Sequence, residues 1–545
     1  MVEKNELRRY VLDNAVLYNG KAILKAVVGH LIGKFPEVKE DMKGFMKDLK
    51  EIVDDVNSMT LEKQNIELEK LGKIIRVKEE SGLFDFLGIK NEKVITAFPP
   101  EPSKYLHIGH AKSLLLNYLL AKEHKGKFIL RFEDTNPELV DKGFYDIILE
   151  DVEWLGIEPD KIQYASDNME LFYDCGKKLI KSGDAYVCFC DSDSIKENRR
   201  KKSECDCRNI EHLDNLRNWL DFFKAAKGKC VVRLKGDMNH KNAVMRDPTL
   251  FRIMTKEHPR TKKKYRIWPT YEFQNSIMDG YFKVSYRLRG KEFENMAELQ
   301  KYIQELLKLN VTSTYEFARF NMVGILSSGR TIREKIKKKE LKGWDDPRLT
   351  TLVALRRRGF LPDAIKDFVV STGISKSEST MTWGDLIIKN KRKIDAVASR
   401  YFFIENPKKI EIEGFKGKDV EVPLHMDHLD LGVRKFKVKN KFYVPEELSK
   451  RKYYRFMHLF NFKNGKFVSE GLDRSLDAKL IHWLPVSKDL VKVRVLMDDG
   501  EYVSGLAEPG VKKLKVGDLI QFERFGFVRL DKKGKDKLEF IFTHK

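Results

Sequence analysis

The sequence predicts an α/β protein in which a parallel-sheet domain is combined with helical segments and an all-β end. Three observations lead to this prediction: a strand–helix–strand pattern at 94–132, helical spacing on both sides of the α/β region, and apolar alternation from about 405 onward. With 545 residues, of which 42% are hydrophobic, the chain can form several folded cores.

The strand–helix–strand pattern is the strongest local signal. The apolar run 94–98 predicts a buried strand, about 109–123 predicts a helix, and 128–132 predicts a second strand. Such a unit joins parallel strands, and ligands bind beyond the carboxyl ends of those strands. We therefore expect residues 99–110 and 133–136 to line one crevice.

The segments on either side of the α/β region differ in the spacing of their apolar residues. Apolar residues recur at helical spacing in Leu7–Val16, Ile23–Ile32 and Met42–Val56, which predicts a small helical bundle. Near the other end, runs such as Leu519–Phe527 predict strands, and Asp499-Gly500 predicts a hairpin turn. Antiparallel barrels would suit this part of the chain.

Charge and composition restrict the function. The formal net charge of +22 favours a polyanionic partner. No run of about 18 apolar residues predicts a membrane span, and the charged first residues do not resemble a secretory signal. Six cysteines in 545 residues do not make a disulfide framework. We expect a cytoplasmic protein without a membrane partner.

Two histidines mark the expected crevice. His107 and His110 lie three residues apart at the start of the predicted helix, where free N–H groups and the helix dipole attract phosphate. Gly109 lets a nucleotide approach the backbone, and two imidazoles can donate hydrogen bonds as charge builds on phosphorus. A metal pair or two surface histidines is the alternative, and the preceding strand and proline-rich loop favour the phosphate site.

The same segment carries a family resemblance. Residues 98–110 read Phe-Pro-Pro-Glu-Pro-Ser-Lys-Tyr-Leu-His-Ile-Gly-His. This resembles the ATP-binding motif of class I aminoacyl-tRNA synthetases, in the form used by archaeal glutamyl and eukaryotic-type glutaminyl enzymes. Further similar segments occur at 130–137, 151–156, 268–273, 288–292, 343–348 and 355–360, and the specific matches span about 94–403.

The resemblance implies a reaction and a domain order. ATP with Mg²⁺ would activate glutamate to glutamyl-adenylate, and the acyl group would pass to the 3′-terminal ribose of tRNA(Glu). A glutaminyl enzyme, an inactive tRNA-binding paralogue and a tRNA-nucleoside modifier are the rivals. A monomer is the default expectation. The implied segments are an N-terminal helical domain (1–88), a Rossmann catalytic domain in two halves (89–184 and 266–342), an inserted acceptor-stem domain (185–265), a helical stem-contact region (343–404) and β-barrel anticodon-binding domains (405–545).

The resemblance also implies site residues. Those for ATP are Pro99, Pro100, Glu101, His107, Gly109 and His110; those for catalysis are His107, His110, Ser328 and Arg330; those for glutamate are Glu133, Tyr271, Asn275 and Arg289. A guanidinium fork suits a carboxylate, so Arg289 favours glutamate over glutamine. Three alternatives are an ion pair of Glu133 with Arg131, a core position for Tyr271 and a structural salt bridge for Arg289.

Three positions depart from the family pattern. Ala97 replaces an arginine that holds the substrate side chain, and Lys104 replaces a glycine beside the nucleotide loop. The second ATP loop, at 325–330, lacks the usual lysine. Arg330 is the best substitute because its guanidinium can grip phosphate, and a surface position for Arg330 is the alternative.

The cysteines form two Cys-x-Cys pairs. Residues two apart on a strand face the same way, so Cys188, Cys190, Cys205 and Cys207 could meet around zinc. Four ordinary thiols are the alternative. Cys175 and Cys230 lie outside the pattern and are expected to be buried apolar residues.

Overall fold

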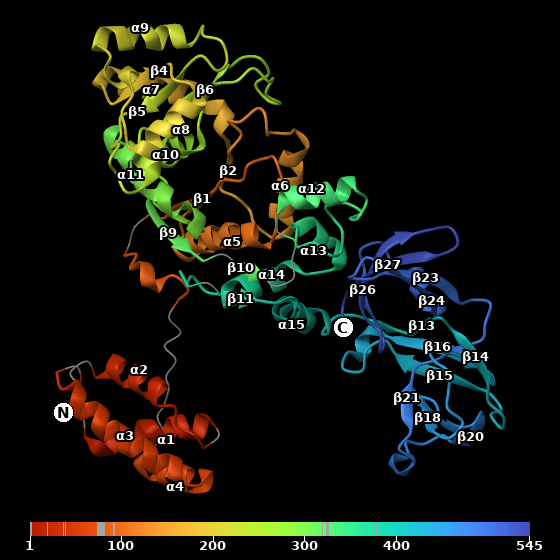
Figure 1. Ribbon diagram of the computed structural model, residues 1–545. Helices are drawn as coiled ribbons and strands as arrows, with labels where there is room; N and C mark the ends of the chain where they lie inside the picture. Colours follow the sequence, from red (N-terminus) through yellow and green to blue (C-terminus); the bar gives the residue numbers. More distant parts are fainter. Residues whose placement is uncertain are drawn as a thin grey trace. The chain divides into compact units, whose positions relative to one another are not determined.

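The structure is a computed structural model in which the chain divides into two compact units, Met1–Leu87 and Gly88–Lys545. Figure 1 shows their elements. Among the residues described, no helix is both long and apolar enough to cross a membrane. The structure describes residues 3–18, 20–35, 38, 40–72, 82–90, 93–318, 320–322, 326, 328–377 and 379–545.

The first unit is a helical bundle. Its helices are α1 (Lys4–Leu17), α2 (Leu24–Lys34), α3 (Met42–Ser58) and α4 (Leu61–Leu71). The three predicted helices are confirmed, and α4 was not predicted. Asp41 and Thr60 cap α3 and α4 by accepting hydrogen bonds from backbone N–H groups. Leu12, Leu49 and Val56 are fully buried where the helices pack together.

The second unit contains a five-stranded parallel sheet with the order β3-β2-β1-β8-β9. The strands are β1 (Ile95–Phe98), β2 (Lys127–Phe132), β3 (Lys161–Tyr164), β8 (Tyr286–Gly290) and β9 (Ser313–Phe317), with α5 (Ile108–Glu123) between β1 and β2 and α6 (Gly143–Trp154) between β2 and β3. The predicted strand–helix–strand unit is confirmed. Because the strand order reverses between β1 and β8, the ligand crevice of such a fold lies between their carboxyl ends.

A second, antiparallel sheet interrupts this domain after α7 (Met169–Ser182). Its order is β4 (Ala185–Cys188), β5 (Val231–Leu234), β6 (Thr249–Ile253) and β7 (Ile267–Pro269), accompanied by α8 (Ser192–Lys201) and α9 (His212–Phe222). The strand β7 lies just past residue 265, so the inserted sheet continues beyond that position. The chain then returns to the parallel sheet: α10 (Tyr271–Tyr281) precedes β8, and α11 (Glu294–Leu306) lies between β8 and β9.

Helices follow the parallel sheet. They are α12 (Gly329–Lys337), α13 (Leu352–Arg358), α14 (Pro362–Ser371) and α15 (Trp383–Ile394), and a short parallel pair is formed by β10 (Phe320–Met322) and β11 (Ser379–Met381). The guanidinium of Arg358, at the end of α13, donates to the carbonyl oxygen of Thr543 at 2.7 Å. This contact joins the helical region to the last strand of the chain.

The remaining chain is β-rich, as predicted. A seven-stranded sheet has the order β12 (Arg400–Tyr401), β25 (Leu519–Phe522), β26 (Gly526–Lys533), β27 (Leu538–His544), β23 (Val491–Leu496), β24 (Tyr502–Ala507) and β13 (Phe403–Glu405). Smaller sheets use β14 (Lys408–Glu411), β15 (Lys418–Pro423), β16 (Val433–Val438), β17 (Lys441–Val444), β18 (Tyr453–Phe456), β19 (Asn461–Lys463), β20 (Lys466–Ser469), β21 (Lys479–Ile481) and β22 (Leu484–Pro485).

Two turn predictions had different outcomes. The hairpin at Asp499-Gly500 is confirmed, because β23 and β24 pair antiparallel on either side and Gly500 has a φ of +94°. The prediction of one strand over Leu519–Phe527 is wrong. The chain reverses between β25 and β26, and Arg524 has a φ of +63° in that turn. Glu523 and Arg524 lie in this turn, but Phe522 before them and Phe525 and Phe527 after them kept the segment rich in apolar residues, so the pattern alone did not reveal the turn.

Candidate functional site

The two predicted histidines form the cap of α5. His107 is the N-cap residue, and its Nδ1 accepts a hydrogen bond from the N–H of Gly109 at 3.0 Å. The Nδ1 of His110 accepts from the N–H of His107 at 3.2 Å, and the two ring centroids lie 3.8 Å apart. Because both Nδ1 atoms accept, each neutral imidazole carries its proton on Nε2, the atom that can donate to a ligand.

The charge state of this pair follows from burial. Burial, together with the charge of Lys104, lowers the pKa of His107 to about 4. Burial and the neighbouring His107 lower the pKa of His110 well below its usual value. Both rings are therefore neutral hydrogen-bond donors near pH 7. The exposed Lys104 supplies the positive charge that acts on both of them.

The structure gives a second reason for a glycine at position 109, which the sequence did not indicate. A Cβ at this position would lie 2.9 Å from Cε1 of His107, which is too close. The glycine therefore lets the His107 ring fold back over the first turn of α5, in addition to any approach of a nucleotide.

The segment 343–352 packs against the histidine motif. The N–H of Ile108 donates to the carbonyl oxygen of Thr350 at 3.0 Å. The ring of Tyr105 stacks on Trp344, with centroids 5.1 Å apart. Two of the segments that carry the family resemblance, far apart in the sequence, are thus in direct contact.

Glu133, directly after β2, is a buried carboxylate. Its side chain is 6% exposed, and its Oε1 has no hydrogen-bond partner among the residues described. The nearest cation, Arg131, has its Nη2 3.7 Å from Oε1, but its hydrogen bonds go to Asp279 and Asn275, each at 2.8 Å. Burial raises the pKa of Glu133 to about 8. The ion pair with Arg131 exists, and among the described residues it leaves Oε1 of Glu133 without a hydrogen bond.

A buried polar network supports the site and was missed by the sequence reasoning. Asp279 accepts hydrogen bonds from Arg131 at 2.8 Å and from Arg287 at 2.7 Å. Although burial opposes ionisation, Arg287 and Arg131 hold the pKa of Asp279 below its usual value. The available signal was the strand β8, on which Arg287 and Arg289 are two residues apart and share one face.

Asn275 belongs to this network. Its Oδ1 accepts from Arg131 at 2.8 Å and from Arg287 at 3.1 Å, and its amide donates to Gln300 at 3.2 Å. It was predicted to line the amino-acid pocket. The described hydrogen bonds of its side chain all go to other residues of the network.

Arg289 lies buried at the edge of the same network. Its Nη1 donates to Oε1 of Gln300 at 3.1 Å, and its Nε lies 3.7 Å from the carboxylate of Glu316. Within the described part of the chain, Nε and Nη2 have no hydrogen-bond partner. The salt bridge considered as the alternative is therefore present as a contact between charges, without a hydrogen bond.

Tyr271 begins α10 beside these charges. Its side chain is half-buried, and its ring centroid lies 5.9 Å from that of Phe293. Burial, then the charge of Glu133, raises the pKa of the phenol, while Arg289 acts in the opposite direction. The hydroxyl thus remains protonated in an environment shared by the predicted acidic and basic residues.

Ala97 is fully buried in β1. It is level with Ile129 of β2, and its neighbour Thr96 is level with Tyr286 of β8. An arginine at position 97 would therefore share a sheet face with Arg131 and Arg287. These two arginines supply positive charge on the face where the family has its arginine.

The second loop is only partly described, since Ile325 and Ser327 lie outside the described residues. Ser328 caps α12 by accepting from the N–H of Thr331 at 3.4 Å. The side chain of Arg330 is 86% exposed and pairs with Glu334 at 3.1 Å. This placement agrees with the alternative of a surface residue, and a phosphate contact by Arg330 stays a prediction.

Comparison with known proteins identifies the family. The model described as "tRNA synthetases class I (E and Q), catalytic domain" matches residues 93–396. The chain belongs to this family. Two anticodon-binding domain models of the same synthetases match residues 398–480 and 480–531. The synthetase is therefore an ATP-using ligase with a catalytic domain followed by anticodon-binding domains.

Relatives match the synthetase along its length. It is 40% identical to the glutamate–tRNA ligase of Methanocaldococcus jannaschii, over 98% of each chain. It is 38% identical to that of Methanothermobacter thermautotrophicus, again over 98% of each. The glutamate–tRNA ligase of Pyrococcus furiosus is 37% identical, over 100% of both chains.

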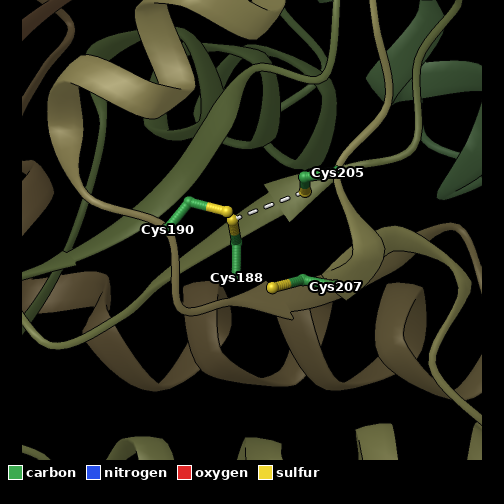
Figure 2. A group of neighbouring side chains, drawn as sticks. All are labelled: Cys188, Cys190, Cys205 and Cys207. Carbon is green, nitrogen blue, oxygen red and sulfur yellow. Dashed lines mark hydrogen bonds between the residues drawn. The ribbon is translucent and has the colours of Figure 1, made fainter.

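The inserted sheet of the synthetase carries a four-cysteine cluster, shown in Figure 2. All four Sγ atoms lie within 4.8 Å of one another, and those of Cys188 and Cys205 are 3.8 Å apart. Zn–S bonds of about 2.3 Å in a tetrahedron place sulfurs about 3.8 Å apart, so the cluster could hold a metal ion.

The backbone around the cluster differs from the expectation. Cys188 ends β4, but Cys207 lies in a 3₁₀ turn (Asp206–Asn209) that follows Cys205. Strand geometry holds only for Cys188: Cys190 follows the end of β4, Cys205 precedes the 3₁₀ turn, and Cys207 lies within it. Cys175 and Cys230 are buried in the apolar core, as predicted.

Proposed function

We propose that this synthetase is a glutamate–tRNA ligase that makes glutamyl-adenylate from ATP and glutamate and charges tRNA(Glu). One observation carries the choice of amino acid. The buried guanidinium of Arg289 keeps Nε and Nη2, among the described residues, without hydrogen-bond partners. This edge fits the side-chain carboxylate of glutamate with two parallel hydrogen bonds, whereas the amide of glutamine can accept only through its single oxygen.

The other end of glutamate requires an anion. In this proposal the ionised carboxylate of Glu133 binds the substrate ammonium, and Tyr271 lies between the two charged ends. The substrate α-carboxylate oxygen then forms a bond to the α-phosphorus of ATP, while the bond from phosphorus to pyrophosphate breaks. No side chain needs to act as a covalent nucleophile, so catalysis rests on positioning and charge stabilisation.

His107 and His110 would stabilise the reacting phosphates. Their neutral rings hold protons on Nε2, which can donate to phosphate oxygens as negative charge accumulates. Mg²⁺ would enter with ATP and neutralise part of the phosphate charge. Pro99, Pro100, Glu101 and Gly109 would shape the nucleotide side of the crevice, with Ser328 and Arg330 on the second loop.

We further propose that the cysteine cluster holds zinc. Four thiolates would fill a tetrahedral site and leave no open position, which is typical of structural zinc. Its role would then be to fix the loops of the inserted, acceptor-stem-binding domain.

The decisive experiment is ATP-dependent charging of purified tRNA with labelled glutamate and, separately, labelled glutamine. We expect charging with glutamate, and we expect Arg289→Ala to abolish it while Arg330→Ala reduces it less. Charging with glutamine alone would overturn the choice of substrate. Binding of tRNA without charging by either amino acid would favour an inactive paralogue.

A further inference from the structure

We infer that Gln300 is a positioning residue that makes the synthetase selective for glutamate by fixing the orientation of the Arg289 guanidinium. The inference deepens the proposed function and rests on it. Gln300 lies on α11, outside every segment that carries the family resemblance, and its side chain is buried beside the site.

The orientation of the Gln300 amide is determined by its partners. Its Nε2 donates to Oδ2 of Asp279 at 2.8 Å. Its Oε1 accepts from Nη1 of Arg289 at 3.1 Å and from Nδ2 of Asn275 at 3.2 Å. An ionised Asp279 can only accept and an arginine can only donate, so a flipped amide would lose both of these contacts.

The contact between Gln300 and Arg289 determines which nitrogens of the guanidinium remain for a ligand. With Nη1 held by Gln300, the Nε and Nη2 atoms remain on the side-on edge, and both lack hydrogen-bond partners in the described structure. That edge binds a carboxylate with two parallel hydrogen bonds. Gln300 therefore uses the one nitrogen that side-on recognition does not need.

Glu316 is the competitor for Arg289. Its carboxylate lies 3.7 Å from Nε of Arg289, and its Oε1 has no hydrogen-bond partner within the described residues. Without Gln300, a small rotation of the guanidinium would convert this contact into a hydrogen-bonded ion pair. The arginine would then be neutralised and its recognition edge occupied, which would remove the advantage of glutamate over glutamine.

A matched control lies one turn further along α11. Gln304 is also fully buried, but its amide donates to the carbonyl of Ser276 at 3.0 Å and to Thr312 at 3.1 Å. The N–H of Thr312 donates back to its Oε1 at 3.0 Å. Gln304→Leu thus removes a buried amide of the same size from the same helix without touching Arg289.

The test compares Gln300→Leu with Gln304→Leu in the full-length protein, with tRNA present. We expect Gln300→Leu to raise the KM for glutamate roughly 10- to 100-fold, the effect of losing one charge-assisted hydrogen bond. The KM for ATP should stay within about twofold. The ratio of kcat/KM for glutamate over glutamine should fall with the affinity for glutamate, and Gln304→Leu should leave it unchanged.

A second variant tests the competition directly. Adding Glu316→Gln to Gln300→Leu should restore part of the affinity for glutamate, because the competing carboxylate is gone. Should Gln300→Leu not fold, Gln300→Met keeps the length of the side chain without its amide, and the same results are expected.

Two failures are distinguishable. If the unmodified protein does not charge glutamate, the proposed function fails. If it does charge glutamate and the Gln300 variants keep both the KM for glutamate and the selectivity ratio, only the role of Gln300 is overturned. A loss of selectivity in Gln304→Leu equal to that in Gln300→Leu would also overturn it, since any buried amide would then suffice.

Discussion

At the scale of single residues, burial sets the charge at both ends of the site. It lowers the pKa of His107 to about 4 and raises that of Glu133 to about 8. The histidine therefore acts as a neutral donor near pH 7, and the carboxylate is largely protonated until a cation arrives. The protonation state of Glu133 can be tested by the pH dependence of glutamate binding, and the role of His107 can be tested by substitution.

We predict that glutamate binding tightens as the pH rises from 6 to 8. The ammonium needs the ionised form of Glu133, so below a pKa of about 8 binding must release a proton, and the KM for glutamate should fall by up to about tenfold per pH unit. The KM for ATP serves as the control. A KM for glutamate that stays constant over this range contradicts the assignment of Glu133.

The same pKa has a consequence for stability. Because the pKa of Glu133 is raised on folding, the native state binds more protons than the unfolded state between the usual carboxyl pKa of 4.5 and about 8. This group therefore favours the folded state most below that window, and its contribution is lost as the pH rises through 8.

Two substitutions separate the roles of His107 as cap and as donor. Asparagine is a good N-cap, so His107→Asn should keep the melting temperature, whereas His107→Ala should cost about 1 kcal/mol of stability. Both should reduce glutamate-dependent pyrophosphate exchange, measured with tRNA present, roughly 10²- to 10³-fold through the lost donor. Full activity of His107→Asn would show that capping is the whole role of this residue.

At the scale of elements, the strand end and loops of the inserted sheet bring the four cysteines together. Cys188 ends a strand and Cys207 lies in a turn, so no regular element by itself fixes the four sulfurs. A metal ion would supply that constraint.

We therefore expect about one zinc per chain by atomic emission after expression with added zinc. Cys205→Ser should lose the metal and lower the melting temperature, because the remaining three thiolates bind zinc less tightly. Cys175→Ala, in the apolar core, should keep the metal. Purified protein without zinc would support four ordinary thiols.

At the scale of the whole second unit, ion pairs connect α13 with the β-rich end. Arg357 binds Asp531 of β26 at 2.7 Å and Asp345 at 3.1 Å. Asp345 is next to Trp344, which stacks on Tyr105 near the histidines. The β-rich end and the segment that precedes the histidine pair of α5 are thus linked through one short segment.

Removing the ion pair between Arg357 and Asp531 should weaken the packing of the β-rich end against α13. Asp531→Asn leaves Arg357 with one carboxylate, so we expect faster hydrogen exchange in 343–358 and β26 and a several-fold lower kcat/KM for tRNA. Glu421→Gln removes an exposed pair with Lys435 and should change neither. Equal exchange in the two variants would show that the Arg357 link adds nothing to the docking of the β-rich end.

Several parts of this molecule could be predicted because they depend on neighbours in the sequence. The spacing of apolar residues predicted α1, α2 and α3, and the strand–helix–strand pattern predicted β1, β2 and the helix α5, at whose start His107 and His110 lie. The hairpin at Asp499-Gly500 could be predicted because its turn needs a positive φ, which glycine adopts readily. The wrong strand at 519–527 shows where a local pattern is insufficient, because apolar residues on both sides of the turn hid it. The role of Arg330, which pairs with Glu334 of its own helix, stays a prediction.

The sequence by itself determined the fold class, the family and the cap of α5, since these depend on periodicity and on residues a few positions apart. Only the tertiary structure decided how Asp279, Arg287 and Gln300 surround Arg289, because parallel strands and a packed helix bring them together from separate segments. Burial then determines their protonation and orientation, and burial is a property of the folded molecule rather than of the sequence pattern.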